Sequence, residues 1–307
     1  MAIAVETSGL TKRYKNTLAV DNIDLKIPEN AFCGFLGKNG AGKTTTLKML
    51  AGLKKPTSGQ ISIMETEQVF GRSQVLPFGY LPDVPSFYSY MTGEEFLDFC
   101  ARLCKIPAGT RKDRVKSLLK QVGLENVRTK VSGYSRGMKQ RLGIAQALIT
   151  SPPVIFMDEP ISALDPVGRR DVIEIIQSLK GATVIFSTHI LADVESICDY
   201  VLIIDKGKIL AQDYMVNLKR TYATNTAKIK FYQQADSARF MPHVKDMKIF
   251  AEQLNPLEVL LRTDSGDSED LSRVVASVLH GNDLAFEAFY AHNPSLEDIF
   301  YEVTGNE

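Results

Sequence analysis

A glycine-rich segment near the N-terminus carries the first residues whose types and spacing are suited to chemistry. Gly37-Lys38-Asn39-Gly40-Ala41-Gly42-Lys43-Thr44 has the G-x-x-x-x-G-K-[ST] spacing of a phosphate-binding loop. Glycines at these positions let the backbone wrap around phosphates, so that successive N–H groups and the start of the following helix face the negative charge. We therefore expect Lys43 to reach the β- and γ-phosphates of a nucleotide and the Thr44 hydroxyl to bind Mg²⁺.

An acidic pair follows a short apolar strand later in the chain. Val154 to Met157 is wholly apolar, and Asp158-Glu159-Pro160 comes directly after it. In open α/β sheets, ligands bind at the carboxyl ends of the strands, which would place both acids beside the phosphate loop. Asp158 is the candidate to hold Mg²⁺ through water, and Glu159 is the candidate to polarise an attacking water. An isolated Asp-Glu pair is usually a solvated turn, so this assignment depends on the strand and on the loop upstream.

The elements that must position these side chains alternate between strands and helices. Ala31 to Leu36 reads as a buried strand that runs into the glycine loop, and a helix is expected from the loop to about Ala51. Val184 to Phe186 is a further apolar strand. The helix expected before it has one apolar face, formed by Val172, Ile175, Ile176 and Leu179. Strands that alternate with helices predict an α/β fold with a mostly parallel sheet covered on both faces.

Other segments of the first two hundred residues also show clear patterns. Val5 to Leu10 reads as a short strand, and the alternation of apolar and polar residues from Asn22 to Ile27 predicts one half-buried strand. Thr92 to Ile149 is mostly helical in pattern, with breaks at Pro107 and around Ser132 to Tyr134. The long helical stretch between strands predicts a helical subdomain at about residues 84–150.

The character of the sequence changes after about Leu218. Polar residues from Thr221 to Thr226 suggest a linker, and a helical segment at Leu271 to Leu279 lies among strand-like segments beyond it. Those segments are Ile229 to Tyr232, Val259 to Leu261 and Leu284 to Tyr290. We therefore predict a first domain at residues 1–220 and a small α+β domain at residues 226–307.

Composition narrows the functional classes. The 307 residues contain 36 Lys plus Arg and 36 Asp plus Glu, and this neutral balance argues against a nucleic-acid partner. No apolar run approaches the roughly 18–20 residues that cross a bilayer, and the apolar start is too short for a signal peptide. We expect a cytosolic protein, for which another polypeptide supplies any membrane part. Cys100 and Cys104 lack nearby partners for a zinc site, so buried thiols are the simpler interpretation.

A further segment resembles the signature of a known family. Tyr134-Ser135-Arg136-Gly137-Met138-Lys139-Gln140-Arg141 resembles the signature motif of ABC ATPases, in the form with tyrosine and methionine seen in antibiotic and drug exporters. The other motifs of that family are present in the expected order over about Val5 to Leu218. They are an aromatic residue similar to the one that stacks on adenine, Tyr14; a Q-loop region, Gly79 to Asp83; a D-loop, Ser162 to Asp165; and a switch histidine, Ser187 to His189.

The resemblance implies an ATPase with a P-loop NTPase core, which takes ATP and Mg²⁺. The residues implied to contact the nucleotide are Tyr14, Gly37, Lys38, Asn39, Gly40, Ala41, Gly42, Lys43, Thr44, Thr45, Ser135 and Gly137. His189 would contact the γ-phosphate and the water held by Glu159, so the implied catalytic set is Glu159, His189 and Lys43. Taken singly, Tyr14 and His189 also have plain packing roles, and Asp165 is also a plausible turn or cap residue.

The signature implies a dimer. Ser135 opens a predicted helix, so its hydroxyl, the neighbouring N–H groups and the helix dipole are suited to binding phosphate. In the family, this site faces the ATP held by the other protomer, so the resemblance implies a homodimer or a pseudo-homodimer that clamps nucleotide at its interface. Binding would close the clamp, and hydrolysis with product release would open it.

Two positions depart from the family pattern. The Q-loop usually carries glutamine, but Asp83 stands there; a carboxylate can still bind Mg²⁺ or its water, although it adds negative charge near the phosphates. Thr44, Asp158 and Asp83 are therefore the candidate metal ligands. In the signature, Arg136 replaces the first glycine, and we expect it near the opposing phosphates or in solvent.

The C-terminal segment resembles one subfamily. Asn293-Pro294-Ser295-Leu296-Glu297-Asp298-Ile299-Phe300 is similar to the closing segment of drug-, antibiotic- and sodium-type exporter ATPases, which work with separately encoded membrane permeases. This resemblance implies an ATPase peripheral to the inner face of the cell membrane, bound to a permease. An import ATPase and a non-transport ABC ATPase are the alternatives. ABC ATPases of translation carry two cassettes in one chain, whereas this chain has one. Those of DNA maintenance have a long coiled coil between the phosphate loop and the signature, and the gap here is too short for it. The sequence does not specify the transported cargo.

An aromatic segment follows the Q-loop position. Phe87, Tyr88 and Tyr90 lie within Val84 to Met91, and Pro82 and Pro85 keep this stretch from forming a regular helix. One interpretation is that the rings pack into the core of their own domain. The other is that some remain exposed as anchors for a permease helix, since aromatic residues are favoured at such interfaces.

Overall fold

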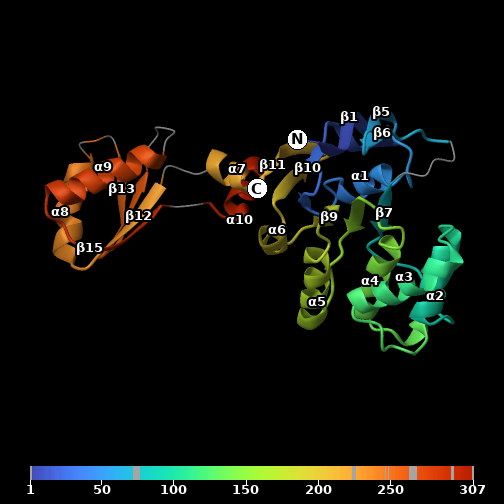
Figure 1. The fold of residues 1–307 in the computed structure, drawn as a ribbon. Coiled ribbons are helices and arrows are strands. Elements are labelled where there is room, and N and C mark those ends of the chain that lie inside the picture. The colour runs from blue at the N-terminus through green and yellow to red at the C-terminus, as the bar shows by residue number, and fades with distance from the viewer. Residues whose placement is uncertain are drawn as a thin grey trace. The chain divides into compact units, whose positions relative to one another are not determined.

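The computed structural model describes residues 2–71, 77–222, 226–245, 247, 249–262, 268–291 and 294–305. The chain forms two compact units, Met1–Met215 and Val216–Glu307 (Figure 1). This division lies slightly before the boundary that the sequence suggested at residue 220. Part of the expected linker, residues 223–225, lies outside the described residues, as does Asn293 of the C-terminal motif.

The central sheet of the first unit has the strand order β11-β10-β4-β9-β8-β7 (Figure 1). Its strands are β4 (Phe32–Leu36), β7 (Phe78–Leu81), β8 (Val154–Asp158), β9 (Thr183–Thr188), β10 (Tyr200–Asp205) and β11 (Lys208–Tyr214). Neighbouring strands are parallel, except that the edge strand β11 runs antiparallel to β10. Every residue of β8 and β9 is buried, as is typical of parallel strands covered on both faces. The α/β fold with a mostly parallel sheet is therefore confirmed.

An antiparallel sheet also belongs to the first unit. Its strand order is β2-β1-β5-β6, and the short strand β3 pairs with β1 as well. The strands are β1 (Ile3–Tyr14), β2 (Thr17–Ile23), β3 (Lys26–Pro28), β5 (Ser58–Ile63) and β6 (Thr66–Glu67). β1 is longer than the strand expected from the sequence, and it ends at the tyrosine that the family motif singles out.

The single strand expected from Asn22 to Ile27 is wrong, because the backbone breaks inside it. Residues 24 and 25 separate β2 from β3, and Asn22, one residue before β2 ends, adopts a φ of 50° in the left-handed region. The Thr7 hydroxyl bridges the break. It donates to the Ile23 carbonyl at 3.0 Å and accepts from the Leu25 N–H at 2.9 Å, so the polar groups at the break are satisfied.

The first unit also contains three helices that follow strands of the central sheet in the sequence: α1 (Lys43–Leu50), α5 (Pro166–Gln177) and α6 (Leu191–Ile197). Buried residues of α1 join apolar residues of both sheets in one core. α6 contacts β4 and β9. The approach is so close at Gly34 of β4 that a Cβ atom there would lie 2.4 Å from Cγ1 of Val194. Only glycine fits at this position, and α6 therefore sits directly on the central sheet.

A helical subdomain lies between β7 and β8 in the sequence. It contains α2 (Gly93–Leu103), α3 (Ala108–Gln121), a 3₁₀ turn at Val131–Gly133 and α4 (Arg136–Ala147). A capping box begins α2, since the Thr92 hydroxyl accepts from the Glu95 N–H and the Glu95 carboxylate accepts from the Thr92 N–H. Pro107 immediately precedes α3. The break at Pro107 is therefore where the sequence suggested it, whereas the second break, expected around Ser132 to Tyr134, is longer and begins after Gln121.

The second unit has the β-α-β-β-α-β order of a ferredoxin-like fold. Its elements are β12 (Thr226–Phe231), α8 (Gln234–Lys245), β13 (Phe250–Asn255), β14 (Glu258–Arg262), α9 (Ser268–Gly281) and β15 (Phe286–Ala291), with α7 (Met215–Thr221) before them and α10 (Leu296–Thr304) after them. The sheet is antiparallel, in the order β13-β14-β12-β15 (Figure 1). β15 is therefore an edge strand within the described residues.

Helices α8 and α9 cover one face of this antiparallel sheet (Figure 1). Alternate residues of β12, among them Ile229 and Phe231, are buried against Phe240 of α8 and Val275 of α9. The sequence pattern did not predict α8, which contains Pro242, or β13, whose side chains are mostly exposed. Across both units, the described residues contain no helix with the length and apolar character that crossing a bilayer requires.

Candidate active site

The glycine loop runs from the end of β4 into the first turn of α1. Gly42 has a φ of 116°, a conformation that side chains with a Cβ rarely adopt, and an added Cβ would lie 2.7 Å from the Ala19 carbonyl oxygen. At Gly37, an added Cβ would lie 2.5 Å from the Ile204 carbonyl oxygen. The loop is therefore seated against β2 and β10 at positions where only glycine fits, and its backbone is left to line a pocket.

Lys43 is buried inside this loop. Its Nζ atom donates to the carbonyl oxygens of Gly37, at 2.7 Å, and of Lys38, at 3.2 Å. The Nζ atom also lies 3.9 Å from Oε1 of Glu159. Burial lowers the pKa of Lys43, while the nearby charges of Glu159 and Asp158 oppose that shift. The ammonium group is thus held at the centre of the loop, where it can exchange these contacts for phosphate oxygens.

Asp158 ends β8 and connects the loop to the neighbouring strand. Its Oδ1 atom accepts from the Thr44 hydroxyl at 2.9 Å and from the Ser187 hydroxyl at 2.8 Å, and the side chain is buried. Ser187, on β9, also accepts from the Glu159 N–H at 3.0 Å. The Ser187 hydroxyl therefore bonds to both acidic residues, at the side chain of Asp158 and the backbone N–H of Glu159. It can do so because Asp158 and Ser187 are paired in the parallel strands β8 and β9.

Glu159 and His189 form the polar edge of the site. Nδ1 of His189 lies 3.1 Å from Oε2 of Glu159. The Glu159 side chain is 15% exposed and that of His189 is 48% exposed, so the carboxylate sits deeper than the imidazole. Glu159 has a φ of 50°, an unfavourable conformation that is characteristic of functional sites. This backbone turn directs the carboxylate away from the strand path and toward the loop.

The residues around Thr44 fit a magnesium ion. Mg²⁺ prefers oxygen ligands and, when bound with a nucleotide, usually takes only one or two from the protein, the rest coming from phosphates and water. The Thr44 hydroxyl and the Asp158 carboxylate supply such oxygens side by side. In the part of the chain that the structure describes, no closed group of three or more acidic, histidine or cysteine ligands is present. The donor set therefore suits a metal that arrives with phosphate.

Asp83 lines the same pocket as the glycine loop. It follows β7, and its Oδ1 atom accepts from the Ser162 hydroxyl of the D-loop at 3.3 Å. The carboxylate is thus near the pocket in which Lys43 and Glu159 also lie. A glutamine at this position would bring no charge, so this chain places one more negative charge by its phosphate site than the family pattern does.

These residues surround a pocket with a volume of about 370 Å³. Those predicted from the sequence that line it are Asn39, Gly40, Gly42, Lys43, Thr44, Thr45, Asp83, Glu159 and His189. Gly37, Lys38 and Ala41 shape the loop behind it. The structure adds Ala19, which no motif signals, and Ser162, which the D-loop motif contains without marking it as a pocket residue.

Tyr14 stands beside the pocket rather than in its lining. It ends β1, and the Nζ atoms of Lys54 and Lys12 lie 4.7 Å and 5.4 Å from the centre of its ring. Burial raises the pKa of Tyr14, but the hydrogen bond and charge of Lys54, with the hydroxyl of Thr45, outweigh it and lower the pKa overall. The ring is partly exposed, and its hydroxyl is close to Thr45 at the start of α1.

The structure does not bring the signature residues to this pocket. Ser135 caps α4, and its Oγ accepts from the Met138 N–H at 3.2 Å. Ser135 and Arg136 are exposed, and Gly137 is close to the first turn of α5, since an added Cβ would lie 3.8 Å from the Cα of Gly168. Among the described residues that line the pocket, none comes from this helix start. The site assembled by one chain is therefore separate from the signature of that chain.

The aromatic segment after the Q-loop position divides into two parts. The Phe87 ring packs edge-on against Phe96, which is buried in the helical subdomain, with 5.0 Å between ring centres. Tyr88 and Tyr90 remain 47% and 62% exposed, and Tyr88 packs edge-on against Phe99 at 5.5 Å. The core interpretation therefore holds for Phe87, whereas the two tyrosines form an exposed aromatic surface.

Comparison with known proteins gives a consistent result. Residues 20–162 match the family model described as "ABC transporter". The chain is 44% identical over 219 residues to an uncharacterised ABC transporter ATP-binding protein, YxlF of Bacillus subtilis, with 71% of this chain and 73% of that protein covered. It is 39% identical over 225 residues to the bacitracin transport ATP-binding protein BcrA of Bacillus licheniformis, with 72% of each chain covered.

Similarity also extends over the second unit. The daunorubicin/doxorubicin resistance ATP-binding protein DrrA of Streptomyces peucetius is 31% identical over 319 residues, with 99% of this chain and 93% of that protein covered. Among solved structures, an ATP-binding subunit of an ABC transporter superimposes with a TM-score of 0.63 at 30% identity, covering 71% of this chain and 93% of that one.

Proposed function

The chain belongs to the ABC transporter ATP-binding family, and we propose that its pocket at Lys43 binds ATP with Mg²⁺ and hydrolyses it to drive export through a separate permease. The observation that carries this proposal is a convergence of side chains. Lys43 and Thr44 from α1, Glu159 after β8 and His189 after β9 line one pocket. Asp158 at the end of β8 is bonded to the Thr44 hydroxyl beside it. Each bears the functional group that phosphoryl transfer to water requires.

Binding begins with the phosphate loop. The backbone N–H groups of the loop and the positive end of α1 attract the β- and γ-phosphates, and Lys43 exchanges its loop carbonyls for phosphate oxygens. Thr44 and Asp158 would hold Mg²⁺, which neutralises charge on the phosphate oxygens when bound. The hydroxyl of Ser187 keeps Asp158 in place for this role.

Hydrolysis needs a base directed at the γ-phosphate. Glu159 would accept a proton from water as the water oxygen forms a bond to the γ-phosphorus, and the bond from that phosphorus to the bridging oxygen breaks to give ADP and phosphate. Nδ1 of His189 lies 3.1 Å from Oε2 and 3.3 Å from Oε1 of Glu159, and Nζ of Lys43 lies 3.9 Å from Oε1. The carboxylate is thus oriented by this chain, and His189 is exposed enough to reach the γ-phosphate.

A second protomer would complete the site. Ser135 and Gly137 open α4 with free N–H groups and a favourable dipole, yet they lie outside the pocket of their own chain. We propose that two copies face each other, so that this helix start of one protomer contacts the γ-phosphate held by its partner. Closure on ATP and opening after hydrolysis would then move a bound permease.

The permease would bind the helical subdomain at the inner face of the membrane. Tyr88 and Tyr90, which follow Asp83 by five and seven residues in the sequence, offer exposed aromatic anchors. The names of two relatives, one for bacitracin transport and one for daunorubicin/doxorubicin resistance, support export over import. The neutral charge of the chain supports a protein partner rather than a nucleic acid.

The test is the ATPase activity of the purified chain, with and without Mg²⁺, beside affinity purification from membranes of the source cells. We expect hydrolysis that requires Mg²⁺, and a multi-spanning membrane protein that co-purifies. If the folded chain hydrolyses no ATP under conditions in which it binds ATP and dimerises, the proposed ATPase role is wrong. A soluble partner in place of a membrane protein would instead favour a non-transport ABC ATPase.

A further inference from the structure

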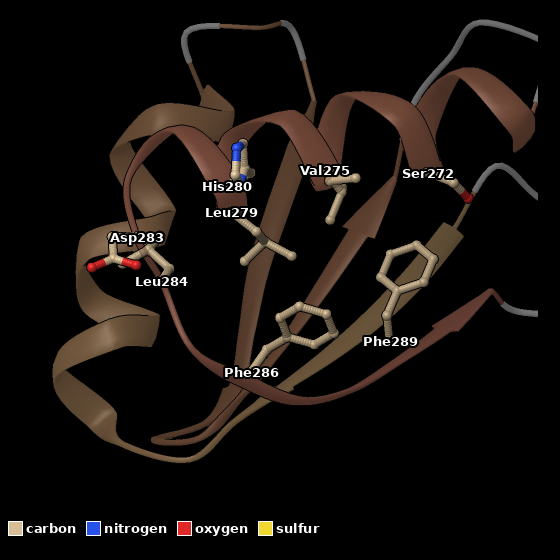
Figure 2. Close-up of a pocket in the computed structure, with 9 residues that line it drawn as sticks. Ser272, Val275, Leu279, His280, Asp283, Leu284, Phe286 and Phe289 are labelled. Atoms are coloured by element: carbon tan, nitrogen blue, oxygen red, sulfur yellow. The ribbon is translucent and has the colours of Figure 1, made fainter.

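The second unit contains a half-open groove between α9 and β15 (Figure 2). Its volume is about 410 Å³, comparable to that of the nucleotide pocket. α9 forms one wall, β15 forms the other, and the turn between these elements closes one end. Most of the lining is apolar, from Val275, Ala276, Leu279, Leu284, Phe286 and Phe289.

The apolar walls of this groove are formed by side chains that α9 and β15 direct toward each other. Val275 and Leu279 are one helical turn apart on α9, so they present one continuous strip to the groove. Phe286 and Phe289 project from β15 toward that strip (Figure 2). Phe286 keeps 41% of its surface exposed although it faces an apolar wall. A space of this size with aromatic and aliphatic walls is typical of a site for a small organic molecule.

The polar groups of the groove are few and define its charge. Ser272 and His280 of α9 and Asp283 of the turn are the polar residues among the described lining, which includes no lysine or arginine. Within the described part of the chain, the Asp283 carboxylate has no ion pair with a basic side chain, although its N–H bonds to the His280 carbonyl at 3.3 Å. Asp283 is thus the one carboxylate among the described lining residues, and its negative charge favours a cationic ligand and disfavours an anion.

We propose that this groove binds a small amphipathic amine. An aromatic or branched aliphatic body would pack between Phe286, Phe289 and the α9 strip, where ring stacking adds to the burial of apolar surface. The ammonium group would lie at the closed end and pair with the Asp283 carboxylate. This site shares no residue with the nucleotide pocket, so its test is independent of the ATPase proposal.

The charge of the ligand is tested with two matched probes. Naphthylethylamine and naphthylethanol share the same aromatic body and differ in the cationic group, and both are titrated into the full-length protein by isothermal calorimetry at neutral pH. We expect one equivalent of amine to bind, roughly five to ten times more tightly than the alcohol, as fits a charge-assisted hydrogen bond at a partly exposed site. Asp283→Asn should remove this preference by weakening amine binding and leaving alcohol binding unchanged.

The position of the site is tested with two tryptophan variants. Ala276→Trp fills the groove, whereas Ser277→Trp places the same ring at the next residue of α9, which does not line it. Because the natural chain has no tryptophan, each variant carries a single one, and its emission with a thermal melt reports whether the unit remains folded. We expect Ala276→Trp to weaken binding of both probes at least tenfold and Ser277→Trp to leave it unchanged.

Several results would overturn the proposal. Equal binding of amine and alcohol, with no effect of Asp283→Asn, would show that the groove does not select a cation. Amine binding that survives in folded Ala276→Trp would place the probe elsewhere. If neither probe binds and Ala276→Trp instead breaks self-association in sedimentation, the groove is an interface between copies of this chain and not a ligand site.

Discussion

Nδ1 of His189 lies 3.1 Å from Oε2 of Glu159, while Nζ of Lys43 lies 3.9 Å from Oε1 of the same carboxylate. These two groups come from the segment after β9 and from the start of α1, so parts of the chain far apart in sequence hold the candidate base. The Glu159 backbone is fixed as well, because its N–H donates to the Ser187 hydroxyl. The orientation of this carboxylate is therefore a property of the folded unit.

Glu159→Gln should keep ATP binding and lose hydrolysis. Glutamine has a similar shape and can keep the contact with His189, but it cannot accept a proton from water. Loss of a general base costs roughly 100- to 10,000-fold in rate, and the variant should accumulate as an ATP-bound dimer in gel filtration. Glu174→Gln, on an exposed face of α5, is the matched control. Turnover at the natural rate would show that Glu159 is not the base.

Lys43→Ala should nearly abolish nucleotide binding, because the β- and γ-phosphates lose the charge fixed inside the loop. The variant also frees the carbonyls of Gly37 and Lys38 that Lys43 now satisfies. Affinity for a fluorescent ATP analogue measures the effect, and Lys48→Ala, later on α1, controls for a general loss of positive charge. Near-normal affinity in folded protein would argue against the phosphate-loop assignment.

A mixed dimer should separate the two halves of the proposed composite site. Combining Lys43→Ala subunits with Ser135→Arg subunits yields one site with both lesions and one site with both halves intact. Each variant alone should be inactive, and the mixture should regain part of the activity. The absence of any recovery, with mixed dimers demonstrated by differential tags, would contradict a site shared between protomers.

Asp83→Gln should reduce the dependence of ATP binding on Mg²⁺. The substitution removes one negative charge from the pocket, and the amide oxygen can still accept from the Ser162 hydroxyl. Affinity for ATP in EDTA should rise roughly threefold to tenfold, since charges near a protein surface interact at an intermediate dielectric and are partly screened. Affinity with Mg²⁺ should change little. An equal change under both conditions would show that the Asp83 charge does not act on the phosphates.

Tyr88→Ala combined with Tyr90→Ala should weaken permease binding without unfolding the chain. Both rings are largely exposed, so their loss should leave the melting temperature within a few degrees. Phe87 is left intact because it packs on Phe96. Tyr232→Ala with Tyr290→Ala in the second unit is the control of matched exposure. A membrane pull-down measures association, and an unchanged yield would remove this surface from the interface.

Features that depend on consecutive residues could be predicted from the sequence. The phosphate loop, the acidic pair after β8 and the cap of α4 each lie within a few residues, and the alternation of strands and helices determines a parallel sheet. The cap at Ser135 follows directly from a hydroxyl residue that opens a helix. Local spacing is sufficient for such features because the partners are neighbours in the chain.

Features set by distant contacts could not be predicted in the same way. The break between β2 and β3 is bridged by the Thr7 hydroxyl, which bonds Ile23 and Leu25. Helix α8 forms in spite of Pro242 because Phe240 is buried in the core of the second unit. The bond from Ser162 to Asp83 likewise joins two loops that only the sheet brings together. The sequence pattern of one loop gives no information about where the other loop lies in the fold.

The contact between Gly34 and Val194 has a consequence for the timescale of nucleotide sensing. α6 begins at Leu191, just after His189, and the missing Cβ at Gly34 lets this helix rest directly on β4. A helix seated this closely cannot slide along the sheet without a clash. We therefore expect His189 to contact a bound γ-phosphate by rotating its side chain, without a shift of α6. Rotations of exposed side chains take picoseconds to nanoseconds, whereas collective helix shifts take microseconds to milliseconds. Detection of the γ-phosphate would then be much faster than the dimer closure that it triggers.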